Sequence, residues 1–274
     1  IGTLYPIAAA AFGVQLSVGP PFFDRTAGPV VLILCAFMAA GPLVRWRRDD
    51  AQAVLTRLTW PLVAAGVALG ATSVFAPATG WLPLFGLSAA AGLAVASILP
   101  LTQRNLRRVP LITWGMVIAH LGIAVSLAGA ASDSAFTVER MVAVGTNQPT
   151  RVGPYSVTLD GIRPTIGPNW SALEAHLTAR RDNGAADVLR PQSRFFSSPP
   201  TTTSESAILT RWNGQLYTVL GQPQGGGRWQ LRLWWKPFVT LIWLGGALIA
   251  LGGLLSLIGR LRRERRSVER DYWG

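Results

Sequence analysis

The chain has 274 residues, of which 50% are hydrophobic and only 14% are charged. A soluble domain of this length rarely carries so few charges, so the composition indicates a polytopic membrane protein. The net charge of +12 is a feature of nucleic-acid binders, but the arginines gather at the ends of apolar segments and in one polar block. The single cysteine, Cys35, excludes a disulfide or a cysteine metal cluster within this chain.

Six apolar stretches predict membrane-spanning helices, because a helix needs about 20 apolar residues to cross a bilayer. The first is only marginally long enough, and the segment after it, Ser17 to Pro29, contains glycines and paired prolines that break helices. The predicted spans are residues 1–18, 30–44, 58–75, 81–101, 111–130 and 238–258. Tryptophans near the span ends are interpreted as interface anchors: Trp46, Trp60, Trp81, Trp234, Trp235 and Trp243.

Orientation is predicted from the arginines in the short connections between spans. Residues 45–57, 104–108 and 260–270 are rich in arginine, whereas the connections at 17–29 and 76–81 carry only Arg25. Because basic short loops stay on the cytoplasmic side, the arginine-rich connections are expected to be cytoplasmic. The long polar block before the last span is then expected to face outward.

This polar block, residues 132–235, predicts a small β-domain. Residues 171–180, 215–221 and 228–235 alternate polar and apolar side chains, and Gly-, Pro- and Asn-rich turns separate them. Short strands at this spacing favour an open barrel or a sandwich. His176 lies on the polar side of the first strand and is interpreted as a solvated side chain.

The expected fold is therefore a mainly α transmembrane bundle of about six helices, with one all-β, barrel- or sandwich-like domain inserted before the last helix. The expected regions are a five-helix membrane region at 1–131 and the β-domain at 132–235, then the last helix at 236–259 and a basic tail at 260–274.

The fifth apolar stretch contains one ionisable side chain, His120. At about 1.5 Å per residue it lies roughly 13 Å from Leu111, near the midplane of the bilayer. Ionisable groups at that depth usually face a bundle interior, and a neutral imidazole suits haem iron or another transition metal. A histidine hydrogen-bonded to a neighbouring helix without a cofactor is an equal alternative. Small neighbours would admit a macrocycle or a second helix: Gly115, Ala119, Gly122 and Ala124.

Two other classes of function are weighed against a cofactor site. A transporter half would show broken spans with intramembrane acids or paired polar residues. Apart from His120, the interiors of the predicted spans contain no Asp, Glu, Lys or Arg. A membrane scaffold that recruits partners without a cofactor is the second alternative, and a haem absorption band would separate it from a haem protein.

Several segments resemble one known family, in the same order along the chain. They are GTLYPI at 2–7, SVGPPFF at 17–23, GPLVRWRRD at 41–49, AHLGIAV at 119–125, ESAILTRWNGQLYTVLG at 205–221 and WKPFVTLIWLGGALIALGGLLSL at 235–257. These segments resemble the CcmF/NrfE family of cytochrome c-type biogenesis proteins. NrfE-type members of this family are dedicated to a nitrite reductase. They share most of these segments, so the NrfE type is an alternative to the CcmF type.

The resemblance implies a haem lyase subunit of the bacterial inner membrane, with the β-domain periplasmic and the tail cytoplasmic. Such proteins take haem from the chaperone CcmE and attach it by thioether bonds to the CXXCH motif of apocytochrome c. The implied partners are CcmE, CcmH/CcmI-type apocytochrome-handling subunits, apocytochrome c and membrane lipid, and no nucleic acid. The family also carries a haem b between two membrane histidines, and His120 matches the second of these axial ligands.

Other parts of the family pattern have no match in this chain. The tryptophan-rich haem-handling motif, its two flanking periplasmic histidines and the first membrane histidine would lie N-terminal to Ile1. The resemblance thus implies that this chain is the C-terminal half of the lyase and assigns it no catalytic residue. It also implies that the chain alone is inactive and shares its haem b with a histidine in the other half.

Overall fold

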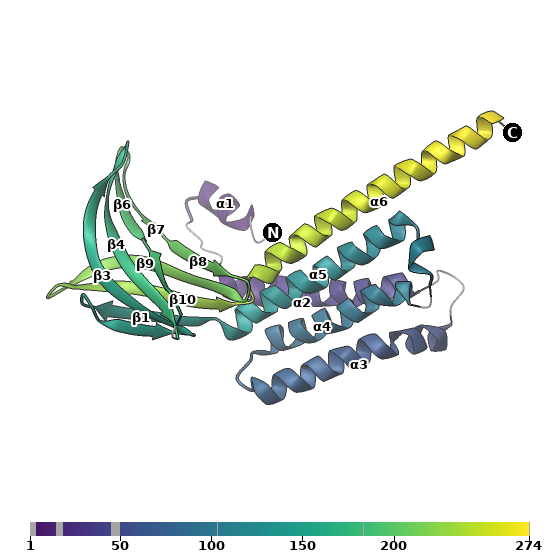
Figure 1. Ribbon diagram of the computed structural model, residues 1–274, viewed down its shortest axis with the longest axis horizontal. Coiled ribbons are helices and arrows are strands. Elements are labelled where there is room, and N and C mark those ends of the chain that lie inside the picture. The colour runs from purple at the N-terminus through teal and green to yellow at the C-terminus, as the bar shows by residue number, and fades with distance from the viewer. Residues whose placement is uncertain (1–3, 15–18, 45–49, 103, 183, 274) are drawn as a thin grey trace. The chain divides into compact units, whose positions relative to one another are not determined.

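A computed structural model of the chain describes residues 4–14, 19–44, 50–102, 104–182 and 184–273, without the side chains of residues 20, 21 and 266–273. The chain forms two compact units (Figure 1). The helical unit comprises Ile1–Ala131 and Leu241–Gly274, and the β unit comprises Ser132–Thr240.

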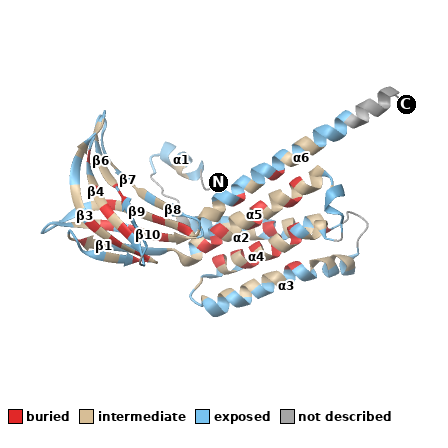
Figure 2. Ribbon diagram, in the orientation of Figure 1, coloured by how far each residue is buried: buried red, intermediate tan, exposed pale blue. Residues whose placement is uncertain are grey.

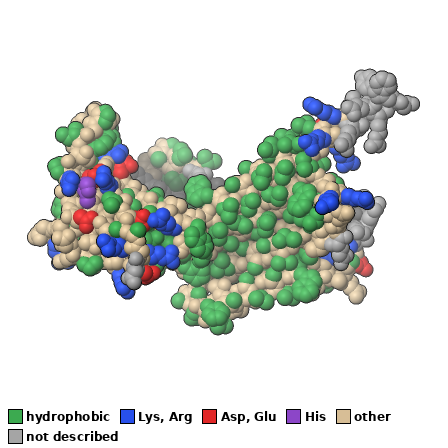
Figure 3. All heavy atoms as spheres, viewed as in Figure 1, with side chains coloured by type: hydrophobic (Ala, Val, Ile, Leu, Met, Phe, Trp, Pro, Cys, Tyr) green, Lys and Arg blue, Asp and Glu red, His purple; other side chains and the backbone are tan. Residues whose placement is uncertain are grey.

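Five helices among the described residues are long and apolar enough to cross a membrane. Hydrophobic side chains cover most of their visible surface, and lysines and arginines lie near helix ends (Figure 3). The helices are α1 Leu4–Ala11, α2 Pro20–Ala40, α3 Ala51–Phe75, α4 Trp81–Ile98, α5 Leu111–Phe136 and α6 Thr240–Trp273, with short 3₁₀ turns at Gly41–Leu43, Leu99–Leu101 and Leu106–Arg108.

The stretch at residues 1–18, expected to be the first of six spans, is not among the five membrane-capable helices of the described residues. Helix α1 has only 8 residues, and Gly13 follows it with a φ of +76°. The Gly13 N–H donates to the carbonyl of Ala10, and the Val14 N–H reaches back to the carbonyl of Ala9, both at 3.0 Å. This is the Schellman arrangement that closes a helix with a left-handed glycine, so α1 ends at Ala11.

The second span begins earlier than expected. The paired prolines do not break α2 but begin it, because the first N–H groups of a helix have no intrahelical partner and Pro20 needs none. The helix also continues through Pro29, as membrane helices often do. A Cβ at Gly28 would lie 2.7 Å from the side chain of Leu82, so this glycine lets α2 approach α4. The basic run at 45–49 lies outside the described residues.

Helix α4 is the most buried of the five membrane helices, and small residues line its contacts (Figure 2). A Cβ at Gly92 would lie 3.1 Å from the Pro61 carbonyl oxygen of α3. The Ser88 hydroxyl donates to the Ala65 carbonyl at 2.8 Å. Close backbone approach and a hydrogen bond between helices thus join α3 to α4, which is the usual way that membrane helices pack.

The β unit is an antiparallel domain of two sheets. One sheet has the order β1-β10-β9-β8 and the other β2-β3-β4-β6-β7, with β5 paired to β4. The strands are β1 Val138–Val144, β2 Pro149–Val152, β3 Tyr155–Ile166, β4 Trp170–Arg181, β5 Ala186–Leu189, β6 Gln192–Ser197, β7 Pro200–Glu205, β8 Ala207–Arg211, β9 Gly214–Gly225 and β10 Arg228–Pro237. The three alternating segments lie within β4, β9 and β10, which confirms the expected all-β domain.

The core of the β unit lies between the two sheets and contains large side chains (Figure 2). Leu177, Leu216 and Leu233 have no exposed surface. Two of the expected interface anchors belong to this domain instead. Trp235 is only 7% exposed and lies against Tyr155, and Trp234 contacts Tyr217 edge-on. The prediction failed because strand β10 continues to Pro237, only three residues before α6 begins.

Candidate functional site

The candidate site lies on α5, which packs against α6 through glycines. The glycines of both helices recur every seven residues, at Gly115, Gly122 and Gly129 on α5 and at Gly245, Gly252 and Gly259 on α6. A Cβ at Gly122 would lie 2.7 Å from the Gly245 carbonyl oxygen. The pairing is antiparallel, since Gly129 meets Ile242 and Gly259 meets Ile112.

This contact answers one question that the sequence left open. The small residues around His120 were expected to admit either a macrocycle or a second helix. A Cβ at Gly252 would lie 2.5 Å from the Ala119 nitrogen and from the Gly115 carbonyl oxygen, and the Ser126 hydroxyl donates to the Ile242 carbonyl at 3.2 Å. Helix α6 therefore fills the stripe through Gly115, Ala119 and Gly122.

His120 lies on a different face of α5 from this stripe. At about 100° per residue, it is displaced by more than a third of a turn from the glycine face. Its ring is partly buried, and Nδ1 lies 2.8 Å from the Met116 carbonyl oxygen, one turn earlier in the helix. Since a carbonyl only accepts, Nδ1 carries the proton in the neutral ring, and Nε2 keeps its lone pair.

This geometry fits one axial ligand of a haem. Histidines that bind metals commonly donate the other ring N–H to a carbonyl or carboxylate, which fixes the tautomer and the ring orientation. Nε2 of His120 has no hydrogen-bond partner among the residues that the structure describes. Those residues also include no cluster of three His, Cys, Asp or Glu side chains suited to a metal ion. The chain thus offers iron one nitrogen from α5.

A methionine sulfur can also bind haem iron, and α2 and α5 contain Met38 and Met116. Met116 turns out to contribute its backbone to the site, because its carbonyl oxygen holds the imidazole of His120. Met38 lies on α2 and is partly buried. The cysteine of the chain, Cys35, is buried on the same helix, as a small apolar residue would be.

His176 is more constrained than the expected solvated side chain. It lies on β4 in the β unit with 18% of its side chain exposed, and its Nε2 is 3.0 Å from Glu174 Oε1. Glu174 also accepts a bond of 2.6 Å from Gln192, and Gln192 accepts one of 2.8 Å from Arg194. Because its ring is held in this chain of polar contacts, His176 has a structural explanation without a ligand.

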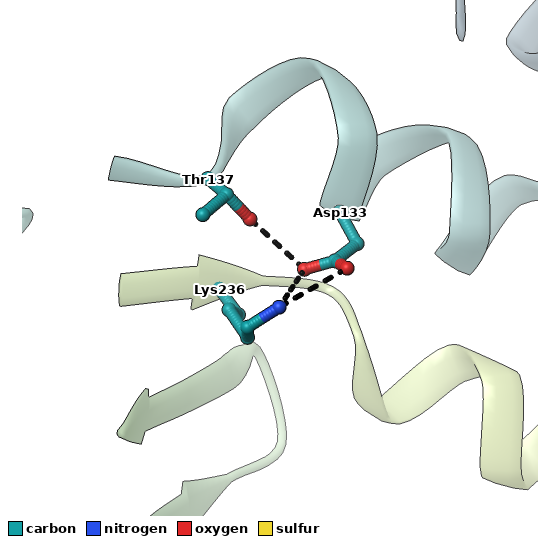
Figure 4. A network of polar contacts seen from close by, with 3 residues as sticks. All are labelled: Asp133, Thr137 and Lys236. Carbon is teal, nitrogen blue, oxygen red and sulfur yellow. Dashed lines mark hydrogen bonds and ion pairs between the residues drawn. The ribbon is translucent and has the colours of Figure 1, made fainter. Parts of the chain in front are cut away.

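A second polar cluster joins the two places where the chain enters and leaves the β unit (Figure 4). Lys236 Nζ lies 3.2 and 3.3 Å from the two carboxylate oxygens of Asp133, and the Thr137 hydroxyl donates to Asp133 at 2.9 Å. Asp133 lies near the end of α5 and Lys236 near the end of β10. Sequence reasoning missed this pair, although one residue begins the polar block and the other ends it.

Comparisons with known proteins relate the chain to one family. Residues 135–237 match the family model described as CcmF C-terminal beta-sandwich. A cytochrome c-type biogenesis protein CcmF from Pseudomonas aeruginosa is 34% identical over 97% of this chain, and a CycK from Bradyrhizobium diazoefficiens is 34% identical over 96%. A cytochrome c-type biogenesis protein NrfE from Haemophilus influenzae is 27% identical over 97%.

The fold also has a solved counterpart. A solved structure named Cytochrome c Heme Lyase CcmF matches 93% of this chain and 42% of its own, with a TM-score of 0.69 and 24% identity. The chain also spans 42% of the length of the curated relatives above. In sequence, the chain is similar to cytochrome c-type biogenesis proteins of the CcmF type, and residues 135–237 match the model of their C-terminal beta-sandwich.

Proposed function

We propose that this chain is the C-terminal part of a cytochrome c haem lyase and that His120 is one axial ligand of a membrane haem b. The observation that carries this proposal is the fixed ring of His120 in the middle of an apolar helix. Its Nδ1 is held by the Met116 carbonyl, and its Nε2 has no protein partner in the described chain. A histidine placed only for packing between helices would use that nitrogen in a hydrogen bond.

The reaction served is the attachment of haem to apocytochrome c. Haem arrives from the chaperone CcmE, and each cysteine thiol of the CXXCH motif adds across one haem vinyl group. The sulfur forms a bond to one vinyl carbon and the thiol hydrogen goes to the other, so no group leaves. Haem b, when bound, supplies electrons that keep the substrate iron reduced. In this chain, Nε2 of His120 would hold that cofactor.

The remaining axial position and the catalytic site belong to other parts of the protein. One histidine lies in the membrane spans of this chain, whereas a bis-histidine haem needs two. We therefore expect the isolated chain to insert but to bind haem weakly and to be inactive. The proposed partners are CcmE, CcmH/CcmI-type subunits and apocytochrome c.

Substitution of the ligand tests this function. In the full-length protein, His120→Ala should remove the reduced haem b band while the protein stays inserted, and added imidazole should restore part of the band. His176→Ala is the matched control and should leave the spectrum unchanged, because that ring is held by Glu174 in the β unit. A normal bis-histidine spectrum in His120→Ala would overturn the ligand assignment.

The higher identity to the CcmF relative than to the NrfE relative, 34% against 27%, supports a lyase of general cytochrome c maturation over a dedicated one. Restoration of several c-type cytochromes in a strain that lacks its own CcmF would agree with this. Restoration of a single nitrite reductase alone would favour the NrfE type.

The proposed topology places the β unit in the periplasm and the arginine-rich connections in the cytoplasm. Cysteines can be placed at Asn105, beside Arg104, and at Gln224, near the end of β9, both of which are exposed. In intact spheroplasts, a membrane-impermeant thiol reagent should label Gln224→Cys and spare Asn105→Cys. The opposite labelling pattern would contradict the proposed orientation.

A further inference from the structure

One exposed aromatic side chain has no role in the fold of the β unit. Trp212 is 83% exposed and lies in the two-residue turn between β8 and β9. Tight hairpin turns favour Asn, Asp and Gly, and the following residues Asn213 and Gly214 already meet that need. A tryptophan at this position therefore contributes nothing that the turn requires.

The turn is bound to the segment that leads into the last membrane helix. The Thr240 hydroxyl donates to the Trp212 carbonyl at 2.9 Å, and the Phe238 N–H donates to the Asn213 carbonyl at 2.9 Å. A Cβ at Gly214 would lie 2.5 Å from the Lys236 carbonyl oxygen, so the backbones approach as closely as glycine allows. These contacts hold the turn against Thr240, the first residue of α6.

The position of the bilayer surface follows from this contact. The apolar part of α6 that is long enough to cross a membrane begins at Thr240. The backbone of Trp212 lies within a hydrogen bond of that residue, so the turn lies beside the N-terminal end of the apolar span. Trp243, in the first turn of the same helix, is 73% exposed, as aromatic residues at membrane interfaces usually are.

The chemistry of this part of the β unit suits lipid headgroups. Phe238 is 40% exposed and Val138, which follows α5, is 38% exposed. The nearest charge on the hairpin is that of Arg211, which makes bonds of 2.6 and 2.8 Å to Asp187. The Asp187 carboxylate raises the pKa of Arg211 by this hydrogen bonding and by its charge. The guanidinium is therefore already partnered beside the bilayer.

We propose that Trp212 is a membrane anchor of the β unit, seated in the lipid headgroup region beside the start of α6. Its indole offers an apolar ring to the acyl chains and an N–H donor to headgroup oxygens, the combination that enriches tryptophan at membrane interfaces. The anchor would attach the β unit to the bilayer beside the connection through which the chain leaves it. The proposal depends on the membrane insertion of α6 and not on haem binding.

Depth-dependent quenching tests this anchor. In the full chain with Cys35→Ser, a nitrobenzoxadiazole dye is attached at Trp212→Cys, and the protein is reconstituted into vesicles of phosphatidylcholine and phosphatidylglycerol. A nitroxide on the lipid headgroup should quench this dye several-fold more than the same dye at Gln224→Cys. Gln224 is exposed near the other end of β9, about 33 Å along the strand.

A comparison of quenchers completes the test. A nitroxide at the middle of the acyl chain should quench the dye at Trp212→Cys less than the headgroup nitroxide does. Because the same dye is attached at both positions, a difference in quenching between positions 212 and 224 reflects their location and not the dye. Equal, water-like emission and equal quenching at the two positions would overturn the proposal, whatever the haem spectrum of the protein.

Discussion

The two units of this protein satisfy their polar side chains in different ways. In the helical unit, Ser88 and Ser126 bond to a carbonyl of a neighbouring helix, but several other hydroxyl groups and the imidazole bond to the carbonyl four residues earlier in their own helix. This holds for Thr26, Thr56, Thr59, Ser73, Ser97 and His120. In the β unit, side chains bond to partners far away in the sequence, such as Arg232 to Glu139 and Arg211 to Asp187.

The comparison explains why one histidine can be positioned inside a bilayer without a polar network. Where there is little water, a helix carbonyl is the nearest acceptor, and Met116 supplies it to His120. The Met116 carbonyl thus satisfies Nδ1 of His120, and only Nε2 is left for a ligand. His176 shows the opposite case, since Glu174 and the residues beyond it hold its ring.

The units also differ in how they fill space, which predicts opposite sensitivities to substitution. The core of the β unit depends on large side chains, and Leu233 has no exposed surface. Leu233→Ala should lower the free energy of unfolding by about 2–5 kcal/mol, because it leaves a cavity between the sheets. Thermal denaturation followed by near-ultraviolet circular dichroism measures this loss. Leu173→Ala, at a side chain that is 38% exposed, is the control and should change little.

The helical unit should instead be sensitive to added volume. Gly252→Val places atoms where the Gly115 carbonyl and the Ala119 nitrogen already lie, and such overpacking costs about 1–3 kcal/mol or more. The thermal midpoint of the detergent-solubilised protein should fall by several degrees. Gly253→Val is the matched control, since nothing lies within 4 Å of a Cβ there. Equal destabilisation by both variants would contradict the α5–α6 packing.

A smaller effect is expected where the chain enters and leaves the β unit. Lys236 and Asp133 are about 30% exposed, so Lys236→Met should cost about 1 kcal/mol. Arg232→Met removes a more exposed pair with Glu139 and should cost less. Denaturation at low and high salt checks both variants, because screening weakens the exposed pair more. A larger loss of stability from Arg232→Met than from Lys236→Met would contradict the expectation that the less exposed ion pair contributes more.

Local features of the fold could be predicted from the sequence. The apolar run of α5 and the alternation in β4, β9 and β10 set the helix and the three strands. The α1 stretch could not be judged by hydropathy alone, because the left-handed Gly13 decides where that helix ends. Pro20 and Pro21 were misread because a proline that breaks a helix interior is favourable at its start.

The candidate site divides in the same way. His120 could be singled out from the sequence, but its hydrogen bond to the Met116 carbonyl could not, because it depends on the orientation of the ring. The Asp133–Lys236 pair and the contact of Trp212 with Thr240 join residues 103 and 28 positions apart. The pairing of β1 with β10 brings the first pair together, and the pairing of β8, β9 and β10 brings the second together. Trp234 and Trp235 were misplaced because strand β10 continues to Pro237, close to the start of α6.

The most direct test of the central claim is an exchange of the ligand at position 120. In the full-length protein, His120→Met should keep haem b but give it one histidine and one methionine ligand, and such ligation raises the reduction potential. A redox titration followed by absorbance should show a higher midpoint potential and an altered reduced spectrum. An unchanged potential and an unchanged bis-histidine spectrum would contradict the account, because His120 would then not bind the iron.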